Sequence, residues 1–65
     1  MKVRDVTRLL VEDGRFQVAQ SESHRQYKHP TKPGRVTVAG KLGHELATGT
    51  LASIMKQAGI EVKRP

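Results

Sequence analysis

The spacing of apolar residues switches twice along this sequence, from helical to alternating and back to helical. Residues 2–13 carry apolar side chains at helical intervals, residues 15–38 alternate, and residues 49–58 return to the helical period. Side chains repeat every 3.6 residues around a helix and every second residue along a strand, so one pattern cannot serve for both. The chain is therefore predicted to fold in the order αβββα, within the α+β class.

Three short strands are expected in the alternating region. The first runs from Arg15 to Gln20, with Phe16, Val18 and Gln20 sharing one face, and a polar turn follows at residues 21–23. The second covers residues 24–29 and ends before a proline, which cannot donate to a strand ladder. RVTV at residues 35–38 forms the third. Consecutive strands joined by short turns predict a three-stranded antiparallel meander.

Both predicted helices carry a single apolar stripe that needs a partner surface. Two such helices are expected to cover one face of the sheet and to leave the other face or its loops exposed to water. For the second helix, Thr48 or Thr50 is the expected N-cap and Gly59 the expected C-cap. Tyr27 is expected in the core or at its edge. The stripes consist of Val3, Val6, Leu9 and Leu10 in the first helix and Leu51, Ile54, Met55 and Ala58 in the second.

Length and composition bound the protein further. Its 65 residues make one domain, residues 1–65, with a thin core, because a chain of this size buries only about 60% of its unfolded surface. The absence of cysteine excludes disulfides and thiolate metal sites and agrees with a reducing compartment. No apolar run approaches the roughly 20 residues of a membrane span. We expect a soluble cytoplasmic protein without a membrane partner.

Positive charge is concentrated in the middle of the chain. The net charge is +6 and the pI is about 10.4, which favours binding to phosphate backbones. Acidic and basic residues cancel in residues 1–14, whereas residues 15–44 carry six Lys or Arg against Glu22 alone. The middle segment is therefore expected to face a polyanion, although basic residues also simply solubilise exposed hairpins.

Two of the three histidines, His24 and His29, lie between Ser21 and Val38, in the middle of this basic segment. Imidazole populates both protonation states near neutrality, so a histidine among cations can transfer protons during RNA cleavage. A histidine beside a turn is more often an ordinary surface residue, and His29, just before Pro30, suits a structural role. His44 is expected to be a solvated loop residue. The histidine spacings match no compact zinc motif.

The segments SHRQYKHPTKPGRVTV and ELATGTLASIMKQAGI resemble the HicA toxin family, and the resemblance extends across nearly the whole chain. It implies a fold similar to double-stranded RNA-binding domains and the activity of a ribonuclease toxin that cleaves mRNA. It also implies inhibition by a HicB-like antitoxin. Family members carry a histidine just after a turn at the start of the second strand, and His24 matches it. The resemblance thus makes His24 the catalytic residue.

Three positions differ from the usual family pattern. Glu22 stands where many members have the glycine that precedes the Ser-His pair. Ala39 and Lys41 stand where many members have a proline and a second histidine after the third strand. Lys41 can still hold a phosphate, and His44 lies in the same loop.

Two functional classes are compatible with these residues. One is a metal-independent endoribonuclease that needs no cofactor and uses His24 as general acid or base. The other is a non-catalytic double-stranded-RNA-binding module, which uses the same charges and needs no histidine. In either class, the predicted RNA-binding residues are Ser23, Arg25, Lys28, Lys32, Arg35 and Lys41.

Overall fold

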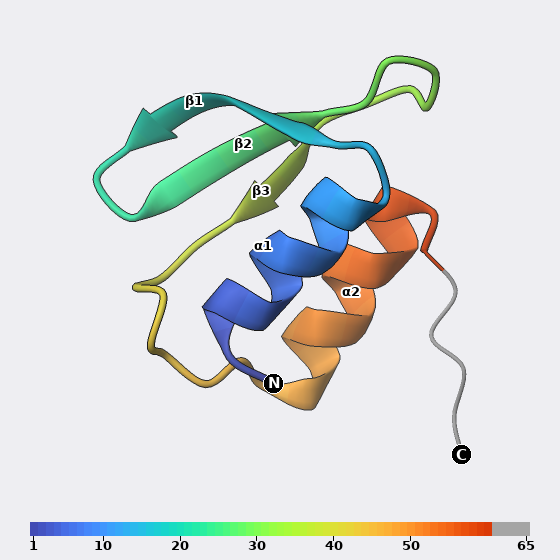
Figure 1. Ribbon diagram of the computed structural model, residues 1–65. Coiled ribbons are helices and arrows are strands. Elements are labelled where there is room, and N and C mark those ends of the chain that lie inside the picture. The colour runs from blue at the N-terminus through green and yellow to red at the C-terminus, as the bar shows by residue number, and fades with distance from the viewer. Residues whose placement is uncertain (61–65) are drawn as a thin grey trace.

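The computed structural model describes residues 1–60 and confirms the predicted order of elements (Figure 1). Residues 61–65, which belong to the expected domain, lie outside the described residues. No helix in residues 1–60 combines the length and the apolar character needed to cross a membrane. The elements are α1 Val3–Glu12, β1 Phe16–Ser21, β2 His24–Lys28, β3 Val36–Val38 and α2 Thr48–Ala58.

Helix α1 begins and ends where local hydrogen bonds satisfy its backbone. The Lys2 N–H donates to Asp5 Oδ2 at 2.9 Å, and the Asp13 N–H donates to the Leu9 carbonyl at 3.0 Å. Gly14 follows with φ +97°, a left-handed conformation that glycine adopts without strain. The chain thereby leaves the helix and enters the sheet.

The sheet has the order β1-β2-β3, and both pairings are antiparallel, as the meander prediction required. Ser21 pairs with His24 across the first turn. A bulge at Val18 shifts the register, so that Phe16 pairs with Lys28 while Gln20 pairs with Arg25. The prediction that Phe16, Val18 and Gln20 share one face is therefore wrong, because the extra residue moves Phe16 and Gln20 to opposite faces.

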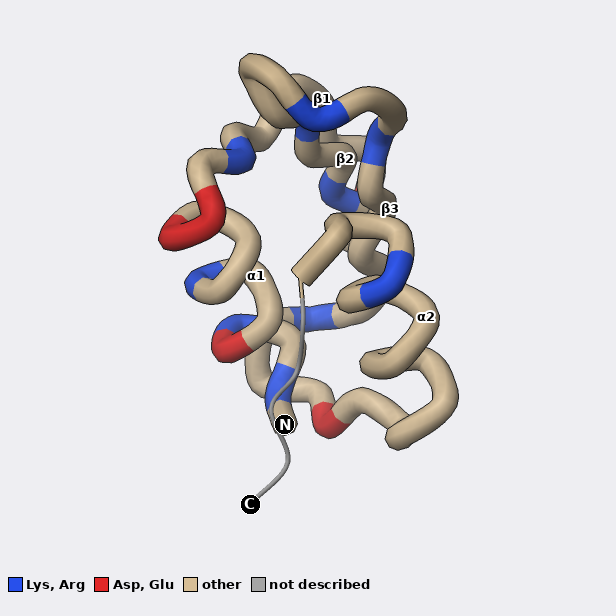
Figure 2. The backbone as a smooth tube through the Cα atoms, turned by 90° about the vertical axis from the view of Figure 1, so that its right-hand side faces the viewer, with Lys and Arg blue, Asp and Glu red and all other residues tan. Residues whose placement is uncertain are grey.

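Both helices lie on the same side of the sheet and run beside each other (Figures 1 and 2). The core between the layers includes Tyr27, as predicted, and the apolar stripes of both helices. All six residues of β1 are exposed. Burial of each aliphatic side chain contributes roughly 1.5–3 kcal/mol to the free energy of unfolding. Because the buried residues come from α1, β2, β3 and α2, these four elements supply the hydrophobic stabilisation. The core residues are Val3, Val6, Leu10, Tyr27, Val36, Val38, Ile54, Met55 and Ala58.

Helix α2 begins one residue before the predicted start. Ala47 is its N-cap and makes no side-chain cap bond, so neither Thr48 nor Thr50 caps the helix. The preceding loop is already fixed, because the Leu46 N–H donates to the Met1 carbonyl at 3.0 Å. Gly59 ends the helix with φ 67°, which confirms the predicted C-cap.

Candidate nucleic-acid interface

His24 lies at the end of a tight hairpin turn. Ser21 and His24 pair as the last and first residues of β1 and β2, and only Glu22 and Ser23 connect them. Glu22 has φ 55°, a conformation that costs a non-glycine residue energy. The Gln20 side-chain amide supports the turn by donating to the Glu22 carbonyl at 3.1 Å. His24 is exposed, so its imidazole is accessible to a bound polyanion.

The loop after β3 is hydrogen-bonded to this turn. The Gly40 N–H donates to the Ser23 carbonyl at 3.1 Å, and Arg25 Nη1 donates to the Gly40 carbonyl at 3.0 Å. Gly40 has φ +108°, which suits glycine alone. Arg25 therefore fixes the loop that follows β3 next to His24, in addition to any contact with RNA.

The same loop brings Lys41 and His44 to the His24 end of the molecule. A Cβ at Gly40 would lie 3.9 Å from the His44 Cβ, which places His44 beside Gly40. The N-terminal end of α1 holds the loop, since the Arg4 N–H donates to the Leu42 carbonyl and the Val3 N–H donates to the His44 carbonyl. Lys41 and His44 are both exposed, as expected for His44.

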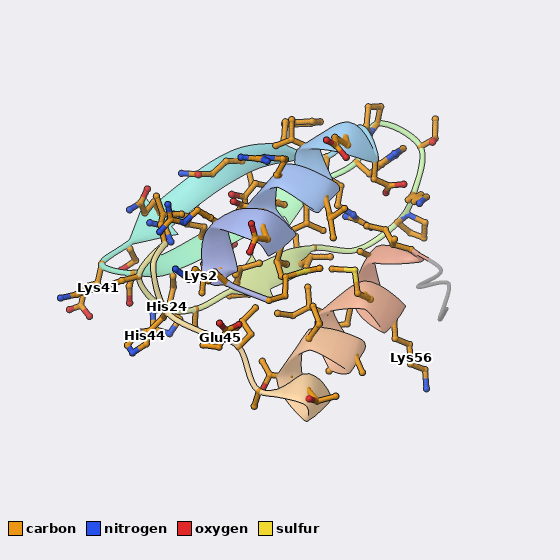
Figure 3. All side chains as sticks on the ribbon, turned by 60° about the horizontal axis from the view of Figure 1, so that its bottom comes forward. Lys2, His24, Lys41, His44, Glu45 and Lys56 are labelled. Carbon is orange, nitrogen blue, oxygen red and sulfur yellow. The ribbon has the colours of Figure 1, made fainter. Side chains whose placement is uncertain are left out.

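Figure 3 shows Lys2, His24, Lys41 and His44 together at this end, whereas Lys56 of α2 lies at the other end. We call the group Ser23, His24, Lys41 and His44 the histidine cluster. It combines two imidazoles and an ammonium group, which are the residue types that proton transfer and phosphate binding require.

Lys28 and Arg35 lie on the side of the sheet that faces away from the helices. Tyr27 is buried against the helices, so its neighbours Gln26 and Lys28 point the other way. Arg35 Nη1 donates to Gln26 Oε1 at 2.7 Å, which directs the guanidinium over this face. We call this surface the open face; in the strands it comprises Phe16, Ala19, Ser21, His24, Gln26, Lys28 and Thr37.

Lys32 lies away from the histidine cluster, and its side chain contacts the ends of both helices. Its Nζ contacts Asp13 Oδ2 at 2.8 Å and donates to the Ala58 carbonyl at 3.3 Å. The hydrogen bond from Lys32 lowers the pKa of Asp13. Asp13 follows α1, while the histidine cluster adjoins the other end of this helix, about 15 Å away. Lys32 joins the ends of both helices rather than extending the cluster.

His29 has a structural role, as the sequence suggested. Its Nδ1 accepts from the backbone N–H groups of Thr31 and Lys32 at 3.1 and 3.0 Å, so the ring proton is on Nε2. Nε2 donates to the Asp13 carbonyl at 2.8 Å. A Cβ at Gly14 would approach Nε2 to 3.0 Å, so only glycine fits there. His29 fastens the loop after β2 to the end of α1.

Arg15 is buried, which the charge pattern did not predict. It is 2% exposed, and its Nη2 donates to the Ala58 carbonyl at 3.3 Å. Nε and Nη1 have no hydrogen-bond partner within residues 1–60. Arg15 was counted with the residues that face a polyanion, but burial removes it from that surface.

The charge distribution distinguishes the two layers. Figure 2 marks acidic residues on α1 and in the loop before α2, and it marks Lys and Arg on both helices as well as in the strand layer. The sequences of β1, β2 and β3 contain no Asp or Glu. Within the part of the chain described, no group of three or more His, Cys, Asp or Glu is arranged to hold a metal ion.

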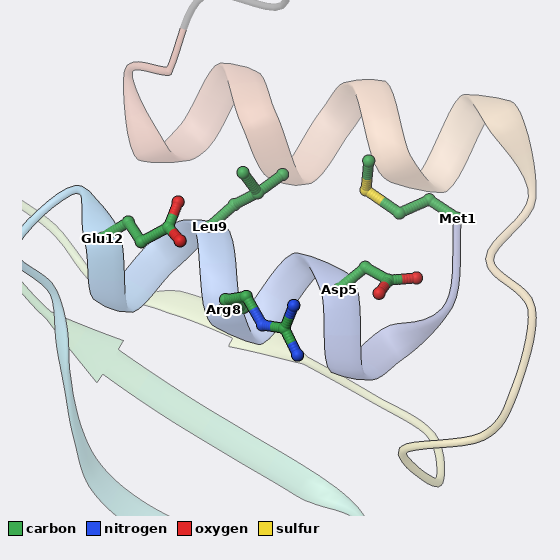
Figure 4. Close-up of a pocket in the computed structure, with 5 residues that line it drawn as sticks. All are labelled: Met1, Asp5, Arg8, Leu9 and Glu12. Carbon is green, nitrogen blue, oxygen red and sulfur yellow. The ribbon is translucent and has the colours of Figure 1, made fainter.

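A separate cavity of about 630 Å³ lies along α1, lined by Met1, Asp5, Arg8, Leu9 and Glu12 (Figure 4). Met1 and Leu9 project toward α2, and the charged side chains form the rim. It contains no histidine and no predicted site residue, so we do not assign the candidate site to it.

Comparison with known proteins identifies the family. A family model described as the HicA toxin of bacterial toxin-antitoxin systems matches residues 3–60. No curated protein matches the chain. The match covers both helices, all three strands and the histidine cluster. This chain therefore belongs to the HicA family of toxins, whose members act in pairs with an antitoxin.

Proposed function

We propose that this toxin is a metal-independent endoribonuclease that cleaves mRNA, with His24 as the proton-transfer residue. The observation that carries the proposal is the position of His24: an exposed imidazole at a tight turn, at the end of the molecule that also carries Lys41 and His44 (Figure 3). Family membership supplies the toxin role. The reaction and the residue that performs it are our inference.

RNA can be cleaved through its own 2′-hydroxyl group, which attacks the adjacent phosphate. The reaction needs a base to take the hydroxyl proton, an acid to protonate the leaving 5′-oxygen, and cations to stabilise the negative charge on the non-bridging phosphate oxygens. His24 serves as base or acid, and the Lys41 ammonium group stabilises the phosphate. His44 is a second imidazole, in the loop that is hydrogen-bonded to the same turn. DNA lacks the 2′-hydroxyl, so the reaction is selective for RNA.

The antitoxin that this family implies is proposed to be HicB-like and acidic, and to cover His24. An acidic partner complements both the net charge of +6 and the strands without Asp or Glu. Binding to the folded toxin also stabilises it by mass action. Co-expression with the adjacent open reading frame and a pull-down would test this; recovery of toxin alone would argue against it.

The decisive experiment compares the purified protein with His24→Ala on an RNA substrate in the presence of a chelator. We expect cleavage by the parent protein, no cleavage by His24→Ala, and a 2′,3′-cyclic phosphate on the product. His24 is exposed, so its replacement should leave the fold intact.

Two further histidine variants serve as controls. His44→Gln should reduce the rate far less than His24→Ala, and His29→Gln should act through stability. Full activity in folded His24→Ala would refute the catalytic role. Absence of cleavage by the parent protein, with RNA binding retained, would instead assign the chain to the non-catalytic double-stranded-RNA-binding class.

A further inference from the structure

Phe16 is exposed on the open face without contributing to the core. It is 49% exposed and lies outside the cluster of buried and partly buried apolar residues. A single exposed apolar residue is common and carries no meaning alone. Here the register places Phe16 directly opposite Lys28, on the face that carries His24.

The surroundings of Phe16 suit an unpaired nucleotide. Lys28 lies across the strand pair, and the Arg35 guanidinium is held over the same face by Gln26. Surfaces that bind single-stranded RNA combine cations for the backbone with aromatic side chains on which bases stack. No acidic residue occurs in the strands to repel the phosphates.

The open face also connects Phe16 to the histidine cluster. His24, Gln26 and Lys28 are alternate residues of β2, so they follow one another along this face. From His24 to Lys28 the strand spans about 13 Å. A backbone bound at Lys28 can therefore continue to the imidazole of His24, a few nucleotides along the chain.

We propose that Phe16 is a stacking site for an unpaired base, and that the substrate class is therefore single-stranded RNA. In a duplex each base is already stacked and paired, so its face is not available to Phe16. The proposal rests on the proposed function only in taking RNA as the ligand; it does not require His24 to be catalytic.

The test measures binding in a His24→Ala background, where the RNA stays intact. The probes are a short fluorescein-labelled single-stranded RNA and the same sequence annealed to its complement. Phe16→Leu retains an apolar side chain without an aromatic ring, and Phe16→Tyr retains the ring. We expect Phe16→Leu to weaken single-strand binding roughly 5- to 150-fold and Phe16→Tyr to bind like the parent.

Two controls make the test specific. Val18→Ala alters another exposed apolar residue of β1 and should leave the affinity unchanged. An RNA series with one abasic nucleotide at each position should contain a position where the parent loses affinity and Phe16→Leu does not. Thermal unfolding confirms that each variant is folded, which is expected because Phe16 lies outside the core.

Each other outcome is informative. Unchanged binding in Phe16→Leu, or an equal loss for duplex and single strand, would overturn the stacking site. Loss of antitoxin binding with RNA binding retained would assign Phe16 to a protein interface instead. If RNA binding depends on Phe16 but the parent protein does not cleave RNA, only the nuclease proposal is contradicted. If cleavage depends on His24 but substitution of Phe16 changes nothing, only the stacking site is contradicted.

Discussion

Glu22 occupies the position beside His24 that glycine would fill most easily. Its φ of 55° lies in the left-handed region, and its carboxylate repels phosphate next to the proposed catalytic residue. Glu22 therefore disfavours both the turn conformation and the binding of phosphate beside His24. The turn nevertheless forms, because the ladder between β1 and β2 and the bond between Ser23 and Gly40 hold it.

We predict that Glu22→Gly stabilises the toxin and strengthens RNA binding. Relief of the left-handed strain should add about 1 kcal/mol, which raises Tm by about 4–8 °C in a domain of this size. Ser23→Gly is the matched control, since Ser23 has no positive φ and gains nothing from glycine. Glu22→Gln separates the effects, because it removes the charge and keeps the strain. A lower Tm in Glu22→Gly would contradict the prediction.

Among the elements, the ends of α1 and α2 are joined by one ion pair and two hydrogen-bonded side chains. Lys32 contacts Asp13 and the last carbonyls of α2, His29 contacts the Asp13 carbonyl, and Arg15 contacts Ala58. These contacts link segments far apart in sequence. They fix the helical layer at the end opposite the histidine cluster.

The lowered pKa of Asp13 predicts a loss of stability in acid. The Lys32 hydrogen bond favours the ionised carboxylate in the folded state, so the folded pKa lies below the unfolded one. Its contribution is complete above the unfolded value, near 4, and is lost as the pH falls through the folded value. Thermal unfolding of the parent and Asp13→Asn from pH 7 to pH 3 should show a difference in Tm that shrinks with acid. A constant difference would exclude this linkage.

The elements were predictable from the sequence, whereas the contacts between their ends were not. Apolar periodicity determines helices and strands locally, and the predicted bounds fall within about one residue of the observed ones. Burial of Arg15 and the pairing of Lys32 with Asp13 depend on contacts between distant segments, for which no local pattern exists. The bulge at Val18 places Phe16 and Gln20 on opposite faces of the sheet, and alternation alone cannot reveal an inserted residue.

The candidate site was predictable only in part. Its turn followed from SES before His24, and the role of His29 followed from its position before Pro30. The proximity of Lys41 and His44 to His24 was not predictable, since it depends on the hydrogen bond between Gly40 and Ser23. The six predicted RNA-binding residues occupy several parts of the fold, and their contacts with RNA remain predictions.

For the molecule as a whole, the absence of Asp and Glu from the three strands, together with Lys28 and Arg35 on the open face, predicts where RNA binds. Cationic contacts release counterions, so affinity should fall steeply as salt increases and should persist in His24→Ala. Lys28→Ala should weaken binding to all sequences, while Lys56→Ala, an equal change of charge on α2, should have little effect (Figure 3). Filter binding over a salt series would measure the salt dependence of the affinity and the effect of each substitution on it. Equal losses in the two variants would show that net charge, not the open face, determines affinity.

The exposure of β1 has a consequence for motion. This strand buries none of its six side chains, so the ladder with β2 and the adjoining turns hold it in place without help from the core. Segments with few buried contacts open most readily, ahead of global unfolding. Amide hydrogens that link β1 and β2 should therefore exchange with solvent faster than those that link β2 and β3. His24 begins β2 directly after the turn of this hairpin. Local opening of the ladder between β1 and β2 would therefore disturb the turn that positions the His24 imidazole.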